Sequence, residues 1–420
     1  MKSNKNNNSD NDSDSDSDYS STSKPKKRIT KPNPKKLPKS LTILPFHFTT
    51  FSSPKIKSKI ISLIHLTHHP SSLFIASTES ILLLNASTFS LQSSLSLYDD
   101  TYNDMLSFTS DNIGSELDDI PTITSALELH LGNIAVASSE VKVYSITSSN
   151  TFNLEYTIDN PDGEGWTIPG MFQYSHNELI ICFRNCVLHY DIQHKVSKAI
   201  YTLHTPNITA IIHYNSSSNS GCNSKCYFLK FNTLYHVNND MKVNEIYKCD
   251  GLGYYKGYYI HNKGFYLDDV NDIIVCYGSN AFEVIDIPNK QSVYRDTKPK
   301  GTAGKLMHVS KLSSTLIGVA VMKGALRVYD YIQKQLLYEI TVNSTIGEYY
   351  LHHIEKEYII TNKAKNEIAL VCVNNTKKVL GTFPIAIAHM FDKGIALQDG
   401  RYIIASQKAF VVITPNALNV

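Results

Sequence analysis

The chain lacks any apolar run long enough to cross a membrane as a helix. Aliphatic stretches such as ILLL at 81–84 and GVAV at 318–321 fall far short of the ~18 residues that a spanning helix needs. The opening sequence MKSNKNNNSDNDSDSDSD contains no apolar run either, so it does not resemble a secretory signal. We therefore expect a protein without a membrane span, located in the nucleus or the cytoplasm.

A strong net charge is also missing from most of the chain. The sequence contains 40 Lys and Arg and 38 Asp and Glu, but residues 1–40 hold 10 of the basic residues and only five Asp. The rest, 30 basic against 33 acidic side chains, is close to neutral. The near-neutral charge of residues 41–420 does not by itself predict binding to nucleic acid or to a membrane. Nucleic acid is therefore expected as a partner only through the basic part of the first 40 residues.

Cysteine is sparse, and spacings typical of metal ligands are missing. The seven cysteines include two CxxxC pairs, Cys182–Cys186 and Cys222–Cys226, whereas a structural zinc site takes four Cys or His ligands from short loops. We interpret these thiols as free and mostly packing residues of a reducing compartment. The segment GTAGKL at 301–306 is too compact for a phosphate-binding loop, and Leu306 stands where Ser or Thr would hold magnesium. The sequence thus predicts no metal and no cofactor.

Residues 1–40 have the composition of a disordered tail. Tyr19 is their only aromatic residue and aliphatic residues are few, so the segment cannot bury enough surface to offset the entropy of ordering the chain. Its first half alternates Ser and Asp, in the pattern of substrates for acidophilic casein-type kinases. The predicted phosphorylation sites, each with Asp three positions downstream, are Ser9, Ser13 and Ser15.

The second half of the tail, residues 24–39, contains eight basic residues and no acid. A nuclear localisation signal or a nucleic-acid contact is one interpretation of this cluster. A solubilising tail whose charges only repel one another is the alternative. The residues that would form the signal are Lys24, Lys26, Lys27 and Arg28.

From residue 41 onward the chain repeats a pair of short apolar strands. Steps between successive second strands run from 41 to 60 residues, and a period of ~40–50 residues with four strands per unit indicates propeller blades. The first step is the longest because an acidic insertion, residues 98–121, interrupts it. The eight pairs are 73–77 with 81–85, 133–138 with 141–146, 179–183 with 187–192, 225–230 with 234–238, 272–277 with 282–287, 316–321 with 326–331, 357–361 with 368–373, and 401–406 with 409–414.

The second strand of several pairs ends in a recurring dipeptide, seen as Tyr190-Asp191, Ile285-Asp286 and Tyr329-Asp330. These strands resemble the third strand of a WD repeat, which ends in Trp-Asp. The best single match is LRVYDYIQKQLLYEI at 326–340, because an outer strand follows the dipeptide at the family's distance. The resemblance covers roughly residues 41–415, without a Trp-Asp or a Gly-His dipeptide anywhere in the chain. It implies a β-propeller of degenerate WD-type repeats.

We therefore predict an all-β fold, with a β-propeller of seven or eight four-stranded blades in residues 41–420 behind the tail 1–40. The number of blades depends on whether the last two repeats are both complete. After the last apolar strand only PNALNV remains, which is too short for an outer strand. Residues 41–51, LTILPFHFTTF, are apolar and have no partner of their own, so we predict that they supply this strand and close the ring.

Two connections between repeats are the predicted partner-binding surface. The segment 162–170, DGEGWTIPG, contains the only tryptophan of the chain, and the insertion 98–121 contains seven acids and no base. An aromatic anchor within a negative rim suits a basic peptide or a basic protein, whereas a tryptophan packed under its own loop is the alternative. The residues that carry this prediction are Trp166, Asp162, Glu164, Asp118 and Asp119.

The segment 253–266, GYYKGYYIHNKGFY, also has two interpretations. Its six aromatic residues, beside Lys256 and Lys263, could stack on bases or on a peptide. An ordinary edge strand with packed tyrosines is the other interpretation.

The leading hypothesis for function is a non-enzymatic scaffold that presents inter-blade loops to protein partners, with no catalytic residues. No acid–base pair, nucleophile arrangement or metal spacing in the sequence points to a reaction. One alternative is a propeller enzyme, because Gly163-Glu164-Gly165-Trp166 resembles a motif of propeller-type glutaminyl cyclases. The other alternative is a nuclear, nucleic-acid-associated propeller, suggested by the basic half of the tail.

Overall fold

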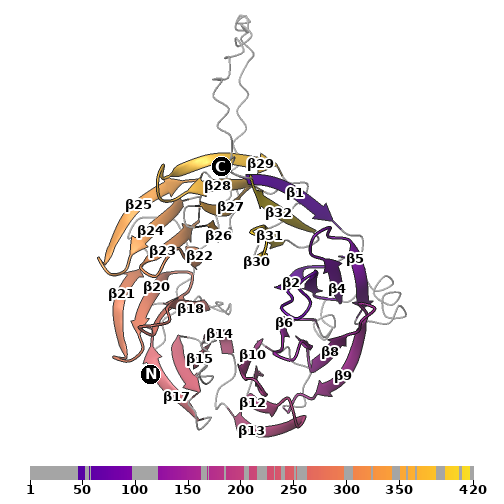
Figure 1. The fold of residues 1–420 in the computed structure, drawn as a ribbon. Helices are drawn as coiled ribbons and strands as arrows, with labels where there is room; N and C mark the ends of the chain where they lie inside the picture. Colours follow the sequence, from indigo (N-terminus) through magenta and orange to yellow (C-terminus); the bar gives the residue numbers. More distant parts are fainter. Residues whose placement is uncertain are drawn as a thin grey trace, which may run out of the picture. The chain divides into compact units, whose positions relative to one another are not determined.

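The fold was obtained as a computed structural model, in which Leu44–Val420 forms one compact unit. The described residues form 32 β-strands, without a helix, in eight four-stranded antiparallel sheets around a central opening (Figure 1). The residues that the structure describes are 46–52, 56, 58–96, 122–161, 168, 170–183, 186–202, 208–214, 225–230, 232–237, 242–249, 252, 263–297, 306–322, 325–342, 351–355, 358–364, 367–384, 393–405 and 409–416.

Each sheet is one blade, and in blades 1 to 7 the strands follow chain order from the centre of the ring outward; in blade 8 the outermost strand is β1. Blade 1 contains β2 (Ile60–His65), β3 (Ser72–Ser77), β4 (Ser80–Asn85) and β5 (Leu91–Ser96). Blade 2 contains β6 (Ser125–Glu128), β7 (Ile134–Ala137), β8 (Val141–Ile146) and β9 (Phe152–Ile158). Blade 3 contains β10 (Gly170–Ser175), β11 (Glu178–Cys182), β12 (Cys186–Asp191) and β13 (Val196–Thr202). Blade 4 contains β14 (Ile208–Tyr214), β15 (Lys225–Lys230), β16 (Thr233–Val237) and β17 (Val243–Lys248).

The second half of the ring repeats the same order. Blade 5 contains β18 (Lys263–Asp268), β19 (Ile273–Tyr277), β20 (Ala281–Asp286) and β21 (Gln291–Thr297). Blade 6 contains β22 (Leu306–Lys311), β23 (Leu316–Val321), β24 (Ala325–Asp330) and β25 (Gln335–Thr341). Blade 7 contains β26 (Leu351–Glu355), β27 (Tyr358–Ala364), β28 (Glu367–Cys372) and β29 (Lys378–Pro384). Blade 8 contains β30 (Lys393–Ala396), β31 (Tyr402–Ala405), β32 (Ala409–Pro415) and β1 (Phe46–Ser52).

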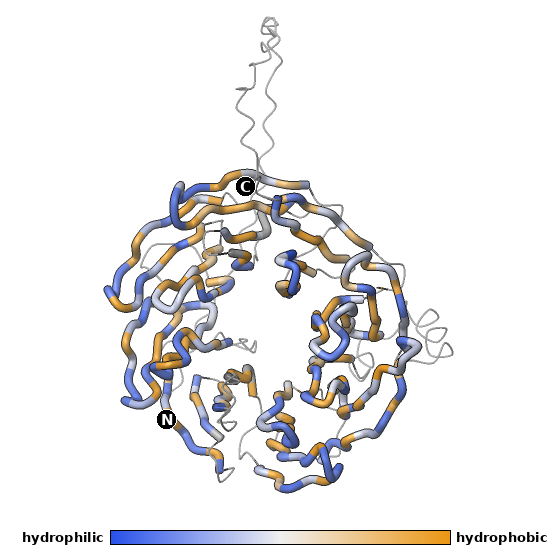
Figure 2. The backbone as a smooth tube through the Cα atoms, viewed as in Figure 1, coloured by the Kyte–Doolittle hydropathy of each residue, from blue (hydrophilic) through white to orange (hydrophobic). Residues whose placement is uncertain are grey.

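These blades confirm the predicted propeller and fix the number of blades at eight. Each apolar pair found in the sequence corresponds to the second and third strands of one blade. These two middle strands are buried on both faces by the neighbouring blades, so they are apolar at successive positions instead of alternating. The hydropathy of the backbone shows apolar residues recurring along every blade (Figure 2).

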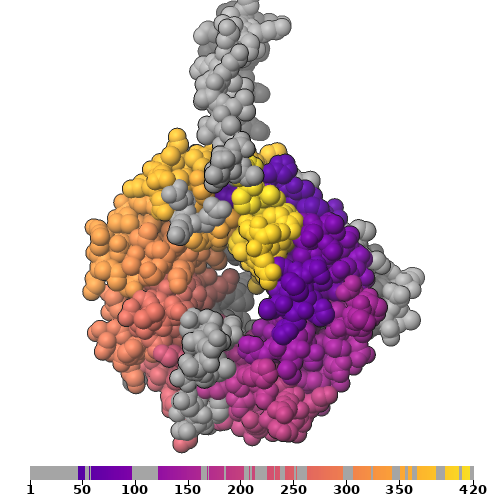
Figure 3. All heavy atoms as spheres, in the orientation of Figure 1, coloured from indigo at the N-terminus to yellow at the C-terminus, as the bar shows by residue number. Residues whose placement is uncertain are grey.

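The core is divided among the interfaces between blades. Eight clusters of buried apolar residues are found, one at each interface, including the interface between blade 8 and blade 1. The space-filling view shows the described blades packed around a hollow centre (Figure 3). Because every blade is packed on both sides, the ring provides a rigid frame for residues on its inner rim.

Closure of the ring joins the two ends of the propeller in one sheet. Strand β1 pairs antiparallel with β32, from Phe46 opposite Pro415 to Ser52 opposite Ala409. Phe46 is only 4% exposed, and the ring of Phe48 stacks on Phe383 of blade 7 with 3.9 Å between centroids. The prediction that residues 41–51 close the ring is confirmed for the described part, with the strand extending to Ser52.

The recurring Asp of the sequence dipeptide caps the turn between the third and fourth strands. In blade 6 the N–H groups of Ile332 and Gln333 donate to Oδ1 of Asp330, both at 2.9 Å. Lys334 then adopts a left-handed backbone with φ of 54°. The side chain thus satisfies amides that the tight turn leaves without a strand partner. Equivalent turns begin at Asn85, Asp191 and Asp286 and end in the left-handed residues Phe89, Lys195 and Lys290.

Candidate binding pocket between blades 5 and 6

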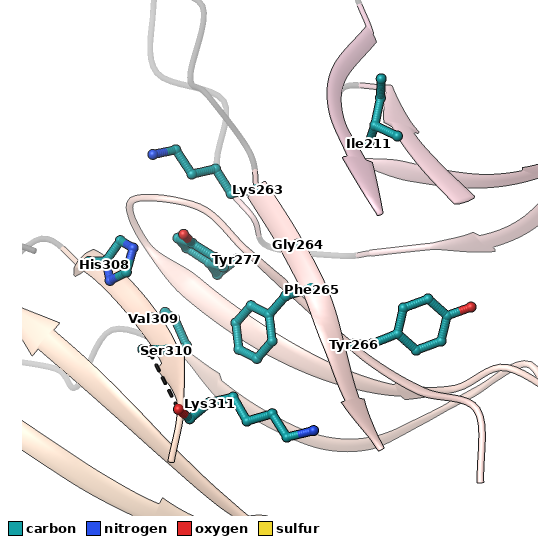
Figure 4. A pocket seen from close by; sticks show the side chains of 10 residues that line it. All are labelled: Ile211, Lys263, Gly264, Phe265, Tyr266, Tyr277, His308, Val309, Ser310 and Lys311. Atoms are coloured by element: carbon teal, nitrogen blue, oxygen red, sulfur yellow. Dashed lines mark hydrogen bonds between the residues drawn. The ribbon is translucent and has the colours of Figure 1, made fainter. Parts of the chain in front are cut away.

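An open pocket of about 580 Å³ lies on the inner rim of the ring, where β18 of blade 5 faces β22 of blade 6 (Figure 4). Both strands are the innermost of their sheets, so the pocket borders the central opening. The described residues that line it are Ile211, Lys263, Gly264, Phe265, Tyr266, Tyr277, His308, Val309, Ser310 and Lys311.

Gly264 determines how closely β18 approaches blade 4. A Cβ atom at this position would lie 2.2 Å from Cδ1 of Ile212 and 3.0 Å from the carbonyl oxygen of Val275. A side chain here would therefore require the Ile212 side chain to move and would crowd the Val275 carbonyl. Glycine lets β18 lie against Ile212, and this places Lys263 and Phe265, its two neighbours in sequence, along the pocket.

The charged groups of the pocket are two lysines. Lys263 begins β18 and Lys311 ends β22, and both are exposed. Figure 4 shows them at opposite ends of the lining, with Phe265 between them. The described lining residues contribute no carboxylate, so the local charge that these side chains create is positive.

His308 contributes a neutral imidazole to the same wall. Its Nδ1 accepts a hydrogen bond from the backbone N–H of Leu351 at 3.3 Å, so the ring proton of the neutral form is on Nε2. Burial, together with the nearby basic groups of His352, Lys263 and Lys393, lowers the pKa of His308 to about 3. His308 therefore stays uncharged near neutral pH, first because burial disfavours the charged imidazolium and then because basic groups lie nearby.

His308 and its three basic neighbours occupy four successive inner strands. Lys263 begins β18, His352 is the second residue of β26, and Lys393 begins β30. The fourth strand is β22, which holds His308 itself. Gly394 packs against this group, because a Cβ there would lie 2.8 Å from Nδ1 of His352. The inner rim of blades 5 to 8 thus gathers basic side chains near the ends at which the inner strands begin.

A second ionisable cluster, in blade 3, stabilises the blade itself. Oε1 of Glu178 accepts from Nζ of Lys198 at 2.8 Å and lies 3.3 Å from Nε2 of His189. Lys198 also lies 3.2 Å from the carboxylate of Asp191, which caps the adjacent turn. Burial is the largest cause of the lowered pKa of His189. These groups pair with one another across β11, β12 and β13, so we assign them to holding the strands together.

The partner-binding residues predicted from the sequence lie outside the described residues, and so do the predicted localisation and phosphorylation sites of the tail. Their flanking strands are described: the acidic insertion joins β5 to β6, and the tryptophan segment joins β9 to β10. Both connections therefore lead from an outer strand to the next inner strand, on either side of blade 2. The residues concerned are Trp166, Asp162, Glu164, Asp118, Asp119, Lys24, Lys26, Lys27, Arg28, Ser9, Ser13 and Ser15.

The pocket was found only in part by the sequence analysis. Lys263, Phe265 and Tyr266 belong to the aromatic segment 253–266, and the structure confirms an edge strand for its described end, since β18 is the inner edge of blade 5. His308 and Lys311 were missed. They lie about 45 positions further along the chain in β22, and only the ring geometry brings them to β18.

The cysteines behave as predicted where they are described. Six of them are buried free thiols: Cys182, Cys186, Cys226, Cys249, Cys276 and Cys372. Within the described ranges, no group of three or more His, Cys, Asp or Glu side chains is arranged to hold a metal ion. The same residues include no helix of the length and apolarity that a membrane span requires.

The comparisons with known proteins establish the fold. No protein-family model and no curated protein sequence matches the chain. Among solved structures, Sqt1 of Saccharomyces cerevisiae superposes with a TM-score of 0.63 at 11% identity, covering 87% of this chain and 98% of Sqt1. BamB of Moraxella catarrhalis has a TM-score of 0.59 at 9% identity, and the computationally designed protein Ika8 has 0.58 at 12%, with the same coverages. At these identities the likeness shows a β-propeller and nothing of its activity.

Proposed function

We propose that this propeller is a non-enzymatic scaffold that binds partner proteins. The observation that carries the proposal is the open pocket on the inner rim, where lysine and aromatic side chains are presented by two adjacent inner strands. Rigid concave surfaces with aromatic side chains and a few convergent polar groups are favourable for binding. The frame is preorganised, because a packed apolar cluster fills each interface between blades.

A second partner surface is proposed at the connections that flank blade 2. Trp166, with Asp162 and Glu164, would act there as an aromatic anchor beside the seven acids of the insertion 98–121. The support from the structure is topological, since the two connections precede β6 and follow β9 of the same blade. Such a surface would suit a basic peptide or protein, with the acids mainly raising the association rate.

The basic tail is proposed to direct nuclear import. Changing Lys26, Lys27 and Arg28 to alanine should move a fluorescent fusion of the full chain from the nucleus to the cytoplasm. Cytoplasmic location of the unchanged fusion would argue against the signal. The glutaminyl-cyclase and nucleic-acid alternatives rest on residues 163–166 and on the tail, so they gain no support from the described residues.

The scaffold proposal is tested by affinity purification of the full chain from cells of the native organism, followed by mass spectrometry. We expect at least one partner near equimolar amount that is lost from a Trp166→Ala variant or from a Lys263→Glu/Lys311→Glu variant. Each variant must first show an unchanged circular dichroism spectrum and melting temperature. Release of ammonia from peptides with N-terminal glutamine would instead favour the enzyme. Recovery of only those proteins that also bind an unrelated propeller would contradict the scaffold.

A further inference from the structure

We propose that the pocket between β18 and β22 binds an acidic, extended segment of a partner protein, in which an apolar side chain lies between two carboxylates. This inference rests on the proposed scaffold function and specifies the chemistry of the partner. It concerns a different surface from the one proposed at Trp166, and it has the opposite charge preference.

The charge of the pocket favours an anionic ligand at two separate points. Lys263 and Lys311 are exposed at opposite ends of the lining. Lys393, which begins the inner strand of blade 8, adds to the positive charge around His308. A carboxylate that approaches either lysine gains a favourable interaction, and the approach of a basic segment is disfavoured by the same charges.

The middle of the pocket is apolar. Phe265, which is half-buried, lies between the two lysines in Figure 4, and the half-buried Ile211 also lines the pocket. Tyr277 and Val309 line it as well but are only 6% and 2% exposed. A volume of about 580 Å³ is within the range of sites that hold small ligands or a few side chains. An apolar side chain placed there removes apolar surface from water, which supplies affinity that two exposed ion pairs alone would not provide.

The strands of the pocket favour a polypeptide over a nucleic acid. Both β18 and β22 are inner edges of their sheets, and edge strands present main-chain groups that an extended peptide can pair with. A nucleic-acid strand needs a continuous basic groove that follows its phosphates. Here the basic groups stand at the ends of an apolar stretch, and residues 41–420 carry slightly more acidic than basic side chains.

The proposal is tested by fluorescence anisotropy of the purified full chain with labelled peptides. The probe is a peptide of sequence Asp-Glu-Leu-Phe-Asp-Glu, compared with a neutral Asn/Gln version and with a version in which Ser replaces Leu and Phe. We expect binding of the first probe only, weakened at least tenfold by Lys263→Glu/Lys311→Glu. The matched control is Lys248→Glu, because Lys248 is an exposed lysine at the end of the outer strand β17. It should leave the affinity unchanged.

Charge reversal distinguishes the pocket from a general electrostatic effect. A peptide with Lys in place of its acids should bind the Lys263→Glu/Lys311→Glu variant better than it binds the unchanged protein. Equal loss of binding in the Lys248→Glu control would overturn the proposal, and so would tighter binding of an oligothymidine strand that depends on the same lysines. If partners are recovered from cells but do not depend on Lys263 and Lys311, the scaffold function stands and the pocket assignment is wrong. If the probe binds as expected but no partner is recovered, the scaffold function fails.

Discussion

The imidazole of His308 accepts a hydrogen bond from the backbone amide of Leu351, with 3.3 Å between Nδ1 and the amide nitrogen. The contact joins the inner strand of blade 6 to that of blade 7. It exists only while Nδ1 has no proton, so protonation of His308 removes it. The positive groups nearby, His352, Lys263 and Lys393, oppose the same protonation.

The first prediction concerns stability against pH. The folded pKa of His308 is lowered to about 3, below the ordinary value of about 6.5. Between these values the unfolded chain binds a proton that the folded chain does not, so stability falls as the pH decreases from about 6.5 toward 3. The slope is at most about 1.4 kcal/mol per pH unit for this one group. His308→Asn should lessen the decline, since asparagine is neutral and its Oδ1 can accept from Leu351.

Urea unfolding at pH 7.5 and pH 5.5 measures this effect. Between these values the unchanged protein should lose about 1.4 kcal/mol more than the His308→Asn variant. The remaining histidines are present in both proteins, so their contribution cancels in the comparison. Parallel loss of stability in the two proteins would show that His308 is protonated as easily in the folded state as in the unfolded state.

The second prediction concerns ring closure by β1. Phe46 is buried between blades 7 and 8, where its ring meets Tyr358 edge-on at 5.3 Å between centroids. Phe46→Ala should lower the free energy of unfolding by about 3–5 kcal/mol, because a large buried aromatic side chain is removed. His47, the next residue, is exposed, so His47→Ala is the matched control and should change little. Similar small effects of both substitutions would mean that β1 contributes little to closure.

The second and third strands of every blade could be predicted because each is buried on both faces. Continuous runs such as 179–183 and 272–277 are apolar at successive positions for that reason. Among the inner and outer strands, the sequence identified individually only the closing strand within 41–51, the outer strand within 326–340 and, as one of two interpretations, the edge strand within 253–266. Strands β6 and β30 contain only four residues each and are partly exposed. Their pairing depends on the neighbouring strands and not on a pattern of their own.

The pocket was less predictable than the fold. The aromatic segment that ends at Tyr266 is conspicuous in the sequence, so its part of the wall could be anticipated. Lys311 occupies the end of a mixed strand, and nothing in its local sequence distinguishes it from other exposed lysines. Its place opposite β18 follows from the position of blade 6 beside blade 5, a relationship that exists only after the ring has formed.

The third prediction concerns the turn of blade 6. Lys334 has a φ of 54°, a left-handed conformation that costs a residue with a Cβ about 1–2 kcal/mol. Lys334→Gly should therefore raise the melting temperature of the protein. Gln333 is an exposed neighbour in the same turn and does not have a positive φ, so Gln333→Gly should leave stability unchanged or lower it. Asp330→Ala should lower the free energy of unfolding by about 0.5–2 kcal/mol, because two backbone amides of the turn lose their acceptor. Differential scanning calorimetry distinguishes the three variants, and a lower melting temperature for Lys334→Gly would refute the strain argument.

The fourth prediction concerns a buried ion pair within blade 5, to which a tyrosine of blade 4 is hydrogen-bonded. Glu283, on β20, is completely buried. Its Oε1 accepts from the hydroxyl of Tyr247 at 2.9 Å and from Nη2 of Arg295 at 2.8 Å. Tyr247 belongs to β17 of blade 4, whereas Arg295 belongs to β21 of blade 5.

Removing the positive charge of this pair should destabilise the protein more than removing the negative charge. Arg295→Met leaves a buried carboxylate without its cation and should destabilise the protein by about 3–5 kcal/mol. Glu283→Gln keeps an acceptor for Tyr247, and the guanidinium of Arg295 is nearly one-third exposed, so water can solvate it and the loss should be smaller. The double variant should be more stable than Arg295→Met alone, because neutral glutamine requires no cation. Urea unfolding of the four proteins gives the coupling free energy directly. Additive losses would mean that Glu283 and Arg295 act independently, and the stability of the interface would then come from the apolar cluster between blades 4 and 5 alone.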